Sequence, residues 1–196
     1  HAGFGAGSRE AMDVRFTRME DAARASEPER ALSLADELER ALAPIGADWA
    51  RALVFRTGIL RAQALEEAGK VDEAIALDRK LLADPALARL PDGAEATDSL
   101  RHNLAYALNN SGGSEEAEAL IRQVLASESK RLGPDHPQTL YTKKVLGQSL
   151  HRQGRLDEAV KLYAEVYEKR KQRYGDAHPL TLGSGGQLAA AYNTLG

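Results

Sequence analysis

The chain has 196 residues, of which 43% are hydrophobic and 5% aromatic, and its 26 basic and 29 acidic side chains leave a formal net charge of -3. This balance excludes a general electrostatic surface for nucleic acid. The chain has no cysteine, which excludes disulfides, thiolate metal sites and cysteine nucleophiles, and no run of about 18 apolar residues that would insert into a membrane. We expect a cytoplasmic protein, although low cysteine content suits the periplasm equally well.

In chain order, the glycine-rich residues 1–8 are expected to be a linker or a remnant of a recombinant sequence. Residues 9–196 are expected to form a single domain. Apolar spacing and turn residues predict nine helices, over residues 9–24, 27–43, 48–68, 71–83, 95–110, 114–131, 138–153, 156–173 and 180–195. Gly183, Gly185 and Gly186 each disfavour a helix by about 1 kcal/mol, so the last helix is expected to fray or to start late. Because no partner helix follows it, the sequence suggests a fragment of a longer protein.

The helices follow a fixed period, marked by four alanines that each come after a short polar stretch. These marker alanines are separated by 43, 43 and 42 residues, and they are Ala31, Ala74, Ala117 and Ala159. Apolar residues follow each marker three and seven positions later, which is the spacing of one helical face. Five positions before each marker stands a small residue where the chain is expected to reverse, namely Ser26, Gly69, Gly112 or Gly154. Each repeat is therefore predicted to be a helical hairpin.

The fourth repeat carries the most recognisable motif, formed by Leu146, Gly147, Leu150, Gly154, Glu158, Ala159, Tyr163 and Val166. This motif resembles the tetratricopeptide repeat signature. The period and the linkers at 132–140 and 174–182 resemble the longer kinesin light chain type. The resemblance implies an all-α fold, a right-handed superhelical solenoid of antiparallel helix hairpins, with about four and a half repeats. It also implies a binding scaffold and not an enzyme.

Several residues that could suggest a chemical site recur with the repeat and are better explained by it. His136 and His178 each precede a proline, as expected for a loop and helix cap. Three acidic pairs open the second helix of a repeat, where they complement its positive end, and they are Asp72-Glu73, Glu115-Glu116 and Asp157-Glu158. No metal site and no cofactor are predicted.

In the family that the chain resembles, the first helix of each hairpin lines a concave groove. The repeat register places eight candidate peptide-binding residues there: His102, Asn103, Tyr106, Asn110, Lys144, Gln148, His151 and Arg152. Amide side chains donate and accept at once, which suits the backbone of an extended peptide, and the basic members favour an acidic one. The carboxylate clamp of chaperone-binding relatives is not reproduced, because Tyr106 and Gln148 stand where its asparagine would be.

We therefore expect a partner that is a protein or an extended, partly acidic peptide, with neither nucleic acid nor membrane insertion. Two alternatives stay open from the sequence. The repeats would serve as a structural spacer or self-association domain if their apolar ends stack on neighbouring chains. They would serve as a ligand-sensing domain if they belong to a larger regulatory protein.

Overall fold

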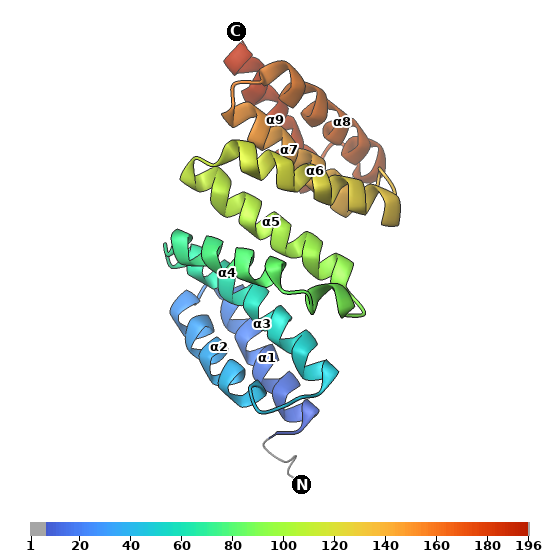
Figure 1. Ribbon diagram of the computed structural model, residues 1–196. Helices are drawn as coiled ribbons and strands as arrows, with labels where there is room; N and C mark the ends of the chain where they lie inside the picture. The colour runs from blue at the N-terminus through green and yellow to red at the C-terminus, as the bar shows by residue number, and fades with distance from the viewer. Residues whose placement is uncertain (1–6, 196) are drawn as a thin grey trace. The chain divides into compact units, whose positions relative to one another are not determined.

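The computed structural model describes residues 7–195, and over these residues it contains helices and no strand (Figure 1). The nine α-helices are α1 (Arg9–Arg24), α2 (Pro28–Leu42), α3 (Asp48–Glu67), α4 (Val71–Ala83), α5 (Gly93–Ser111), α6 (Ser114–Arg131), α7 (Pro137–Arg152), α8 (Leu156–Tyr174) and α9 (Pro179–Leu195). A short 3-10 helix, η1 (Leu87–Arg89), precedes α5. No predicted helix end differs from these bounds by more than two residues. In the described part of the chain, no helix is long and apolar enough to cross a membrane.

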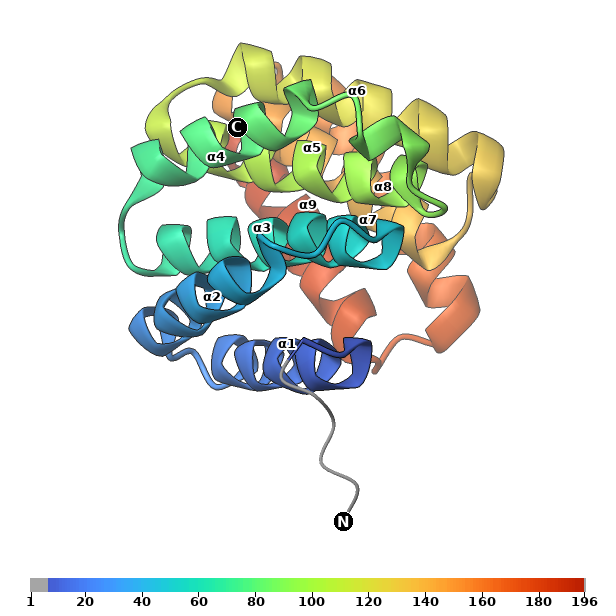
Figure 2. The same cartoon turned by 60° about the horizontal axis from the view of Figure 1, so that its bottom comes forward.

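The chain forms two compact units that divide within α5, and over the described residues they cover 7–107 and 108–195. In the first unit α1 packs against α2 and α3, α2 packs against α3, and α3 packs against α4 (Figure 2). In the second unit α6 packs against α7, α7 against α8, and α8 against α9. Within each unit, helices therefore contact their sequence neighbours, as a chain of helical hairpins requires.

The predicted register is confirmed at the helix contacts and at the turns. All four marker alanines are 0% exposed, so the second helix of each hairpin has no room for a larger side chain there. The four reversal positions all have positive φ, from 53° at Ser26 to 93° at Gly112. Three of the four are glycine, which adopts this conformation without the steric cost that a Cβ brings.

The residue four positions after each marker alanine, which we call the core slot, differs between repeats although it is buried in all of them. It is Ala35, Asp78, Ile121 and Tyr163 in the four repeats, and none of these is more than 3% exposed. Tyr163 fits because Gly147 lies opposite: a Cβ on Gly147 would come within 2.6 Å of the tyrosine Cε1. A large slot residue is thus matched by an absent side chain on the facing helix.

The two histidine-proline linkers act as helix caps, as expected. The Nδ1 atoms of His136 and His178 accept hydrogen bonds from the backbone amides of Gln138 and Leu180, each at 3.2 Å. Each bond satisfies one of the free amides that begin α7 and α9.

The expectation that the last helix starts late is wrong, because α9 begins at Pro179 and runs through the three glycines. Its cap at His178, the proline in its first turn and its packing on α8 together offset the low helix propensity. One glycine has a packing reason, since a Cβ on Gly185 would lie 3.3 Å from the Tyr167 ring. Gly183 and Gly186 face open space.

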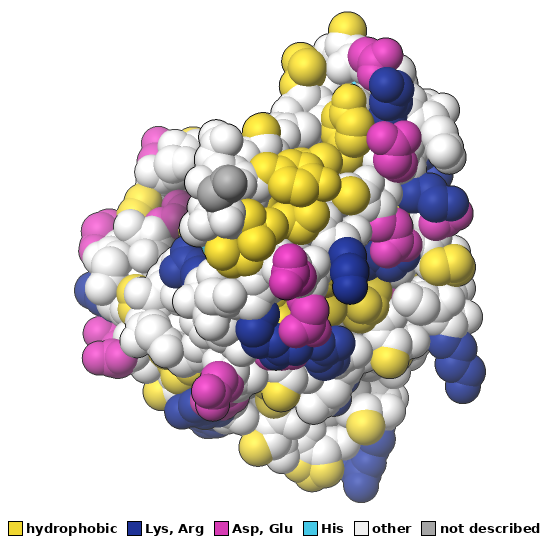
Figure 3. Space-filling view, turned by 90° about the horizontal axis from the view of Figure 1, so that it is seen from above, with side chains coloured by type: hydrophobic (Ala, Val, Ile, Leu, Met, Phe, Trp, Pro, Cys, Tyr) yellow, Lys and Arg dark blue, Asp and Glu magenta, His cyan; other side chains and the backbone are white. Residues whose placement is uncertain are grey.

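One side of α9 is left uncovered. Leu182 is 61% exposed and Tyr192 53%, whereas their equivalents in α7, Leu140 and Leu150, are each 1% exposed. Figure 3 shows hydrophobic side chains gathered on the surface at this end of the chain. A contiguous apolar surface of this kind is typical of an interaction face or of a missing neighbour.

Candidate functional site

In the second unit, three of the predicted binding residues share one face of α7. Lys144, Gln148 and His151 are half-buried and lie four and three positions apart, so they project from the same side of the helix. The Lys144 Nζ lies 4.7 Å from the centre of the Tyr141 ring, which is 42% exposed. We call Tyr141, Lys144, Gln148 and His151 the α7 face. It combines a cation, an aromatic ring and an amide on one helix.

Lys144 has no carboxylate within 4.0 Å among the described residues, in contrast to its neighbour. The Nζ of Lys143 lies 2.5 Å from the carboxylate of Glu165. Burial, and then the nearby charge of Arg170, lower the pKa of Lys144. Its charge is therefore poorly compensated, and an approaching anion would relieve both effects.

The last two predicted residues of the second unit, Asn110 and Arg152, contact each other. The Arg152 guanidinium donates to the backbone carbonyl of Asn109 at 2.6 Å and to the Asn110 side chain at 3.4 Å. Asn109 in turn donates to Ser149 Oγ at 2.9 Å. Arg152 thus holds the end of α5 against α7, a structural role that sequence reasoning did not assign to it.

The three predicted residues of the first unit lie on α5, and we call them the α5 face. Tyr106 is 57% exposed. Asn103 accepts a hydrogen bond from Gln63 at 3.3 Å and donates to the carbonyl of Ile59 at 3.5 Å, so it also ties α5 to α3. Burial lowers the pKa of His102 to about 4, although the charge of Asp98 opposes this. His102 is therefore neutral at physiological pH and does not contribute a positive charge.

Sequence reasoning overlooked a groove between α1 and α3 in the first unit. It has a volume of about 230 Å³ and is lined by Glu20, Ala23, Arg24, Leu60, Gln63, Ala64 and Glu67. Gln63 and Glu67 fall at positions where the repeat register predicts groove residues. The contribution of α1 was missed because the first repeat matches the signature least well.

The comparison with known families decides what this architecture is. Residues 96–172 match the family model described as tetratricopeptide repeat. These residues are tetratricopeptide repeats. No curated protein matches the sequence.

Solved structures extend the fold of these tetratricopeptide repeats to nearly the whole chain. A variant of the nearly identical TPR-like repeats of a protein described as a Podosopora anserina kinesin light chain aligns with a TM-score of 0.77 and 23% identity, over 98% of this chain and 89% of that one. BtubC (BKLC) from P. vanneervenii aligns with a TM-score of 0.72 and 15% identity, over 98% of this chain and 85% of that one. The likeness shows the fold, a TPR-like helical repeat solenoid of the kinesin light chain kind.

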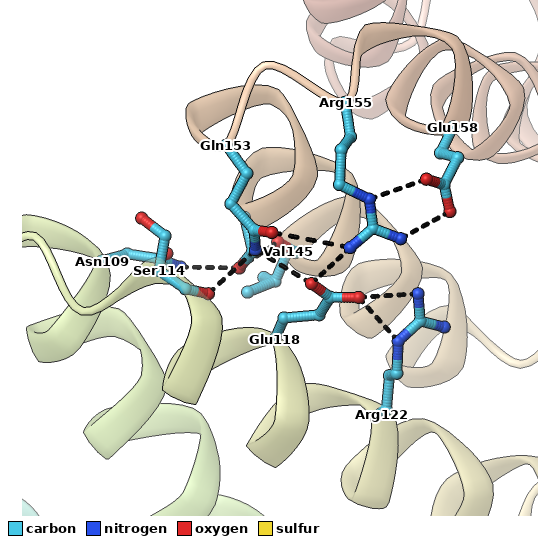
Figure 4. A network of polar contacts seen from close by, with 9 residues as sticks. Asn109, Ser114, Glu118, Arg122, Val145, Gln153, Arg155 and Glu158 are labelled. Carbon is cyan, nitrogen blue, oxygen red and sulfur yellow. Dashed lines mark hydrogen bonds and ion pairs between the residues drawn. The ribbon is translucent and has the colours of Figure 1, made fainter.

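Within the repeats, Glu118 on α6 holds the turn between α7 and α8 (Figure 4). Its carboxylate accepts from Gln153 at 2.9 Å, Arg155 at 2.7 Å and Arg122 at 2.9 Å, and Arg155 also donates twice to Glu158 at 2.7 Å. Burial alone would raise the pKa of Glu118, but the hydrogen bonds from these three side chains lower it. The network is structural, because all of its donors are already engaged.

The core slot of the second tetratricopeptide hairpin holds an unusual acidic pair. Asp78 is 0% exposed, and neither of its carboxyl oxygens has a hydrogen-bond partner among the described residues. Burial, and then the charge of Glu66, raise its pKa to about 8. Burial, and then Glu67, raise the pKa of Glu66 to about 7. The sequence offered one signal for this pair, a carboxylate where the other repeats have alanine, isoleucine or tyrosine.

Proposed function

We propose that the chain is a protein- or peptide-binding module, and that the α5 face and the α7 face contact the partner. The tetratricopeptide fold supports this, because such repeats generally serve as scaffolds for protein interactions. Each face offers an exposed tyrosine, and tyrosine is enriched among the residues that dominate binding energy. The amides and the neutral His102 supply donors and acceptors for a peptide backbone.

The observation that carries the proposal is the uncompensated charge of Lys144. Lys143, one residue earlier, is paired with Glu165, whereas Lys144 lies over Tyr141 without a carboxylate within 4.0 Å in the described part of the chain. A carboxylate of the partner would complete this site with a charge-assisted hydrogen bond. We therefore propose that the partner presents an extended segment with at least one acidic side chain to the α7 face.

A displayed peptide library provides the test. We expect peptides selected on the wild-type protein to be enriched in acidic residues. Lys144→Ala combined with Gln148→Ala should weaken their binding by about 1 to 3 kcal/mol for each contact removed, and added salt should weaken the charged contact further. Fluorescence anisotropy of the selected peptides measures both effects. Arg152 is left unchanged in this variant, because its loss would disturb α5 and α7.

The matched control is Lys161→Ala, which removes an exposed lysine from α8 without touching the α7 face. It should leave binding unchanged, and circular dichroism should show all three proteins equally folded. Selected peptides that bind the Lys144→Ala, Gln148→Ala variant as tightly as wild type would contradict the use of the α7 face.

Self-association is a second candidate function, favoured by the uncovered side of α9. This helix contains no charged residue, and Leu180, Leu182, Tyr192 and Leu195 are all more than 40% exposed. Two such surfaces can meet without like-charge repulsion. Sedimentation velocity over a range of concentrations tests it, and a dimer that Leu182→Ser with Tyr192→Ser returns to monomer is the expected sign.

A further inference from the structure

A pocket on the α1–α2 hairpin contains no residue of either proposed binding face. It has a volume of about 390 Å³ and is lined by Arg15 and Arg18 from α1 and by Glu37, Arg40 and Ala41 from α2. It shares no lining residue with the groove between α1 and α3. Both helices belong to the first unit, so the pocket is complete within one compact part of the chain.

The arginines around this pocket differ from the other arginines of the same helices. Helices α1 to α3 contain nine arginines. Six of them have a carboxylate oxygen within 4.0 Å, namely Arg9, Arg24, Arg30, Arg51, Arg56 and Arg61. Within residues 7–195, the three that have none are Arg15, Arg18 and Arg40, which are the three that line the pocket. Acidic side chains are thus plentiful on these helices but are not placed to neutralise this one group.

The repeat register shows that these charges are not required by the hairpin. Arg15 and Glu37 occupy the positions of Lys143 and Glu165 in the fourth repeat, which form an ion pair at 2.5 Å, yet Arg15 and Glu37 do not come within 4.0 Å of each other. Arg18 occupies the position of Leu146, which is 2% exposed. An arginine therefore replaces a core leucine, and an arginine that could have been paired is left without its partner.

The charge of the pocket selects the ligand. Three guanidinium groups and one carboxylate leave a local charge of 3 - 1 = +2. A phosphate monoester carries about -1.5 to -2 at neutral pH and offers three acceptor oxygens, whereas a carboxylate carries only -1. Guanidinium groups bind phosphate oxygens in a bidentate manner, with two parallel N–H donors each.

We propose that the pocket formed by Arg15, Arg18 and Arg40 binds a phosphate monoester, such as the phosphorylated side chain of a partner protein. The site shares no residue with the α5 and α7 faces, so it would let the chain recognise a phosphorylated segment in addition to the peptide bound there. Glu37 sets the limit of the pocket on one side and disfavours anions of higher charge.

The first arm of the test uses inorganic phosphate as the probe, at pH 7.5 and at ionic strength matched with sodium chloride. Two-dimensional NMR of the amide and arginine Nε–H groups should show saturable shifts confined to α1 and α2. Arg15→Gln with Arg18→Gln should reduce the affinity at least tenfold. This variant should unfold at the wild-type midpoint, because neither arginine has an ion-pair partner among the described residues. The control is Arg24→Gln with Arg30→Gln, which removes two exposed and paired arginines from the same two helices and should bind phosphate like wild type.

The second arm uses a five-residue peptide with a central phosphoserine, its unphosphorylated form and sodium acetate. The phosphoserine peptide should shift the same arginine signals, and the other two probes should not. The proposal is overturned if acetate produces the same shifts as phosphate, if the control variant loses binding as much as the Arg15, Arg18 variant, or if the phosphoserine peptide has no effect.

Discussion

The α3–α4 and α7–α8 hairpins share one register and differ at the core slot. In α7–α8 the slot holds Tyr163, whose ring covers the bare backbone of Gly147. In α3–α4 it holds Asp78, whose buried oxygens have no hydrogen-bond partner in the described part of the chain and which lies near a second carboxyl group, Glu66. The comparison teaches that the repeat fixes the path of the backbone but not the chemistry of its core. One hairpin is stabilised by aromatic packing, whereas the other carries a group that burial destabilises.

The difference makes the second hairpin sensitive to pH, and the sign follows from the raised pKa values. Asp78 has an ordinary pKa near 3.8 and a folded-state pKa of about 8. Between these values the folded protein binds more protons than the unfolded chain, so the free energy of unfolding falls as pH rises. Below about pH 4 both states are protonated, and the penalty is absent. Glu66 acts in the same direction up to about pH 7.

The largest expected effect comes from removing the ionisable group in the second hairpin. Asp78→Asn keeps the shape of the side chain but cannot ionise. It should raise the free energy of unfolding by about 2 to 4 kcal/mol at pH 8 and by much less at pH 4. Urea unfolding at both values measures the difference. The control is Asp72→Asn, an exposed acid in the first turn of α4, and an Asp78→Asn protein with the wild-type pH dependence would contradict the buried pair.

A smaller effect is expected from exchanging the slot pair of the fourth repeat for that of the third. Gly147→Ala places a Cβ 2.6 Å from Tyr163 and should destabilise the protein by about 1 to 3 kcal/mol. Tyr163→Ile in the same chain recreates the alanine and isoleucine found at Ala105 and Ile121, and it should recover at least about 1 kcal/mol relative to additivity.

Gly186→Ala is the control for this double-mutant cycle, because a Cβ there meets nothing within 4 Å. It should stabilise α9 by about 0.5 to 1 kcal/mol, the intrinsic preference of a helix for alanine over glycine. Strictly additive substitutions at Gly147 and Tyr163, measured by chemical denaturation, would show that the two residues do not share one packing site.

The smallest effect is expected in α9, where the register continues without a covering helix. Leu182→Ala should change the free energy of unfolding by less than about 0.5 kcal/mol because Leu182 is exposed. Its equivalent Leu140 is buried, and Leu140→Ala should cost about 2 to 5 kcal/mol. Thermal unfolding at low protein concentration compares the two. Equal losses would mean that a second copy of the chain covers α9.

The features that the sequence predicted well are those that depend on local spacing. Helix limits, the positive φ at Gly69 and the caps at His136 and His178 follow from residues within a few positions of each other. The bonds that give Asn103 and Arg152 a structural role join residues about 40 positions apart. Apolar periodicity carries no information about such polar pairs, and for the same reason it did not single out Asp78. Whether the predicted faces bind a peptide stays a prediction.

The Glu118 network also affects where the chain can be cut. Arg155 and Lys70 occupy the same register position, each at the turn inside a hairpin. The guanidinium of Arg155 lies 2.7 Å from both Glu118 and Glu158, whereas the Lys70 Nζ has Glu29 at 3.5 Å. Trypsin must draw the whole side chain into its own specificity pocket, which requires these contacts to break. Limited digestion should therefore open the α3–α4 turn first and leave the α7–α8 hairpin as a protected fragment.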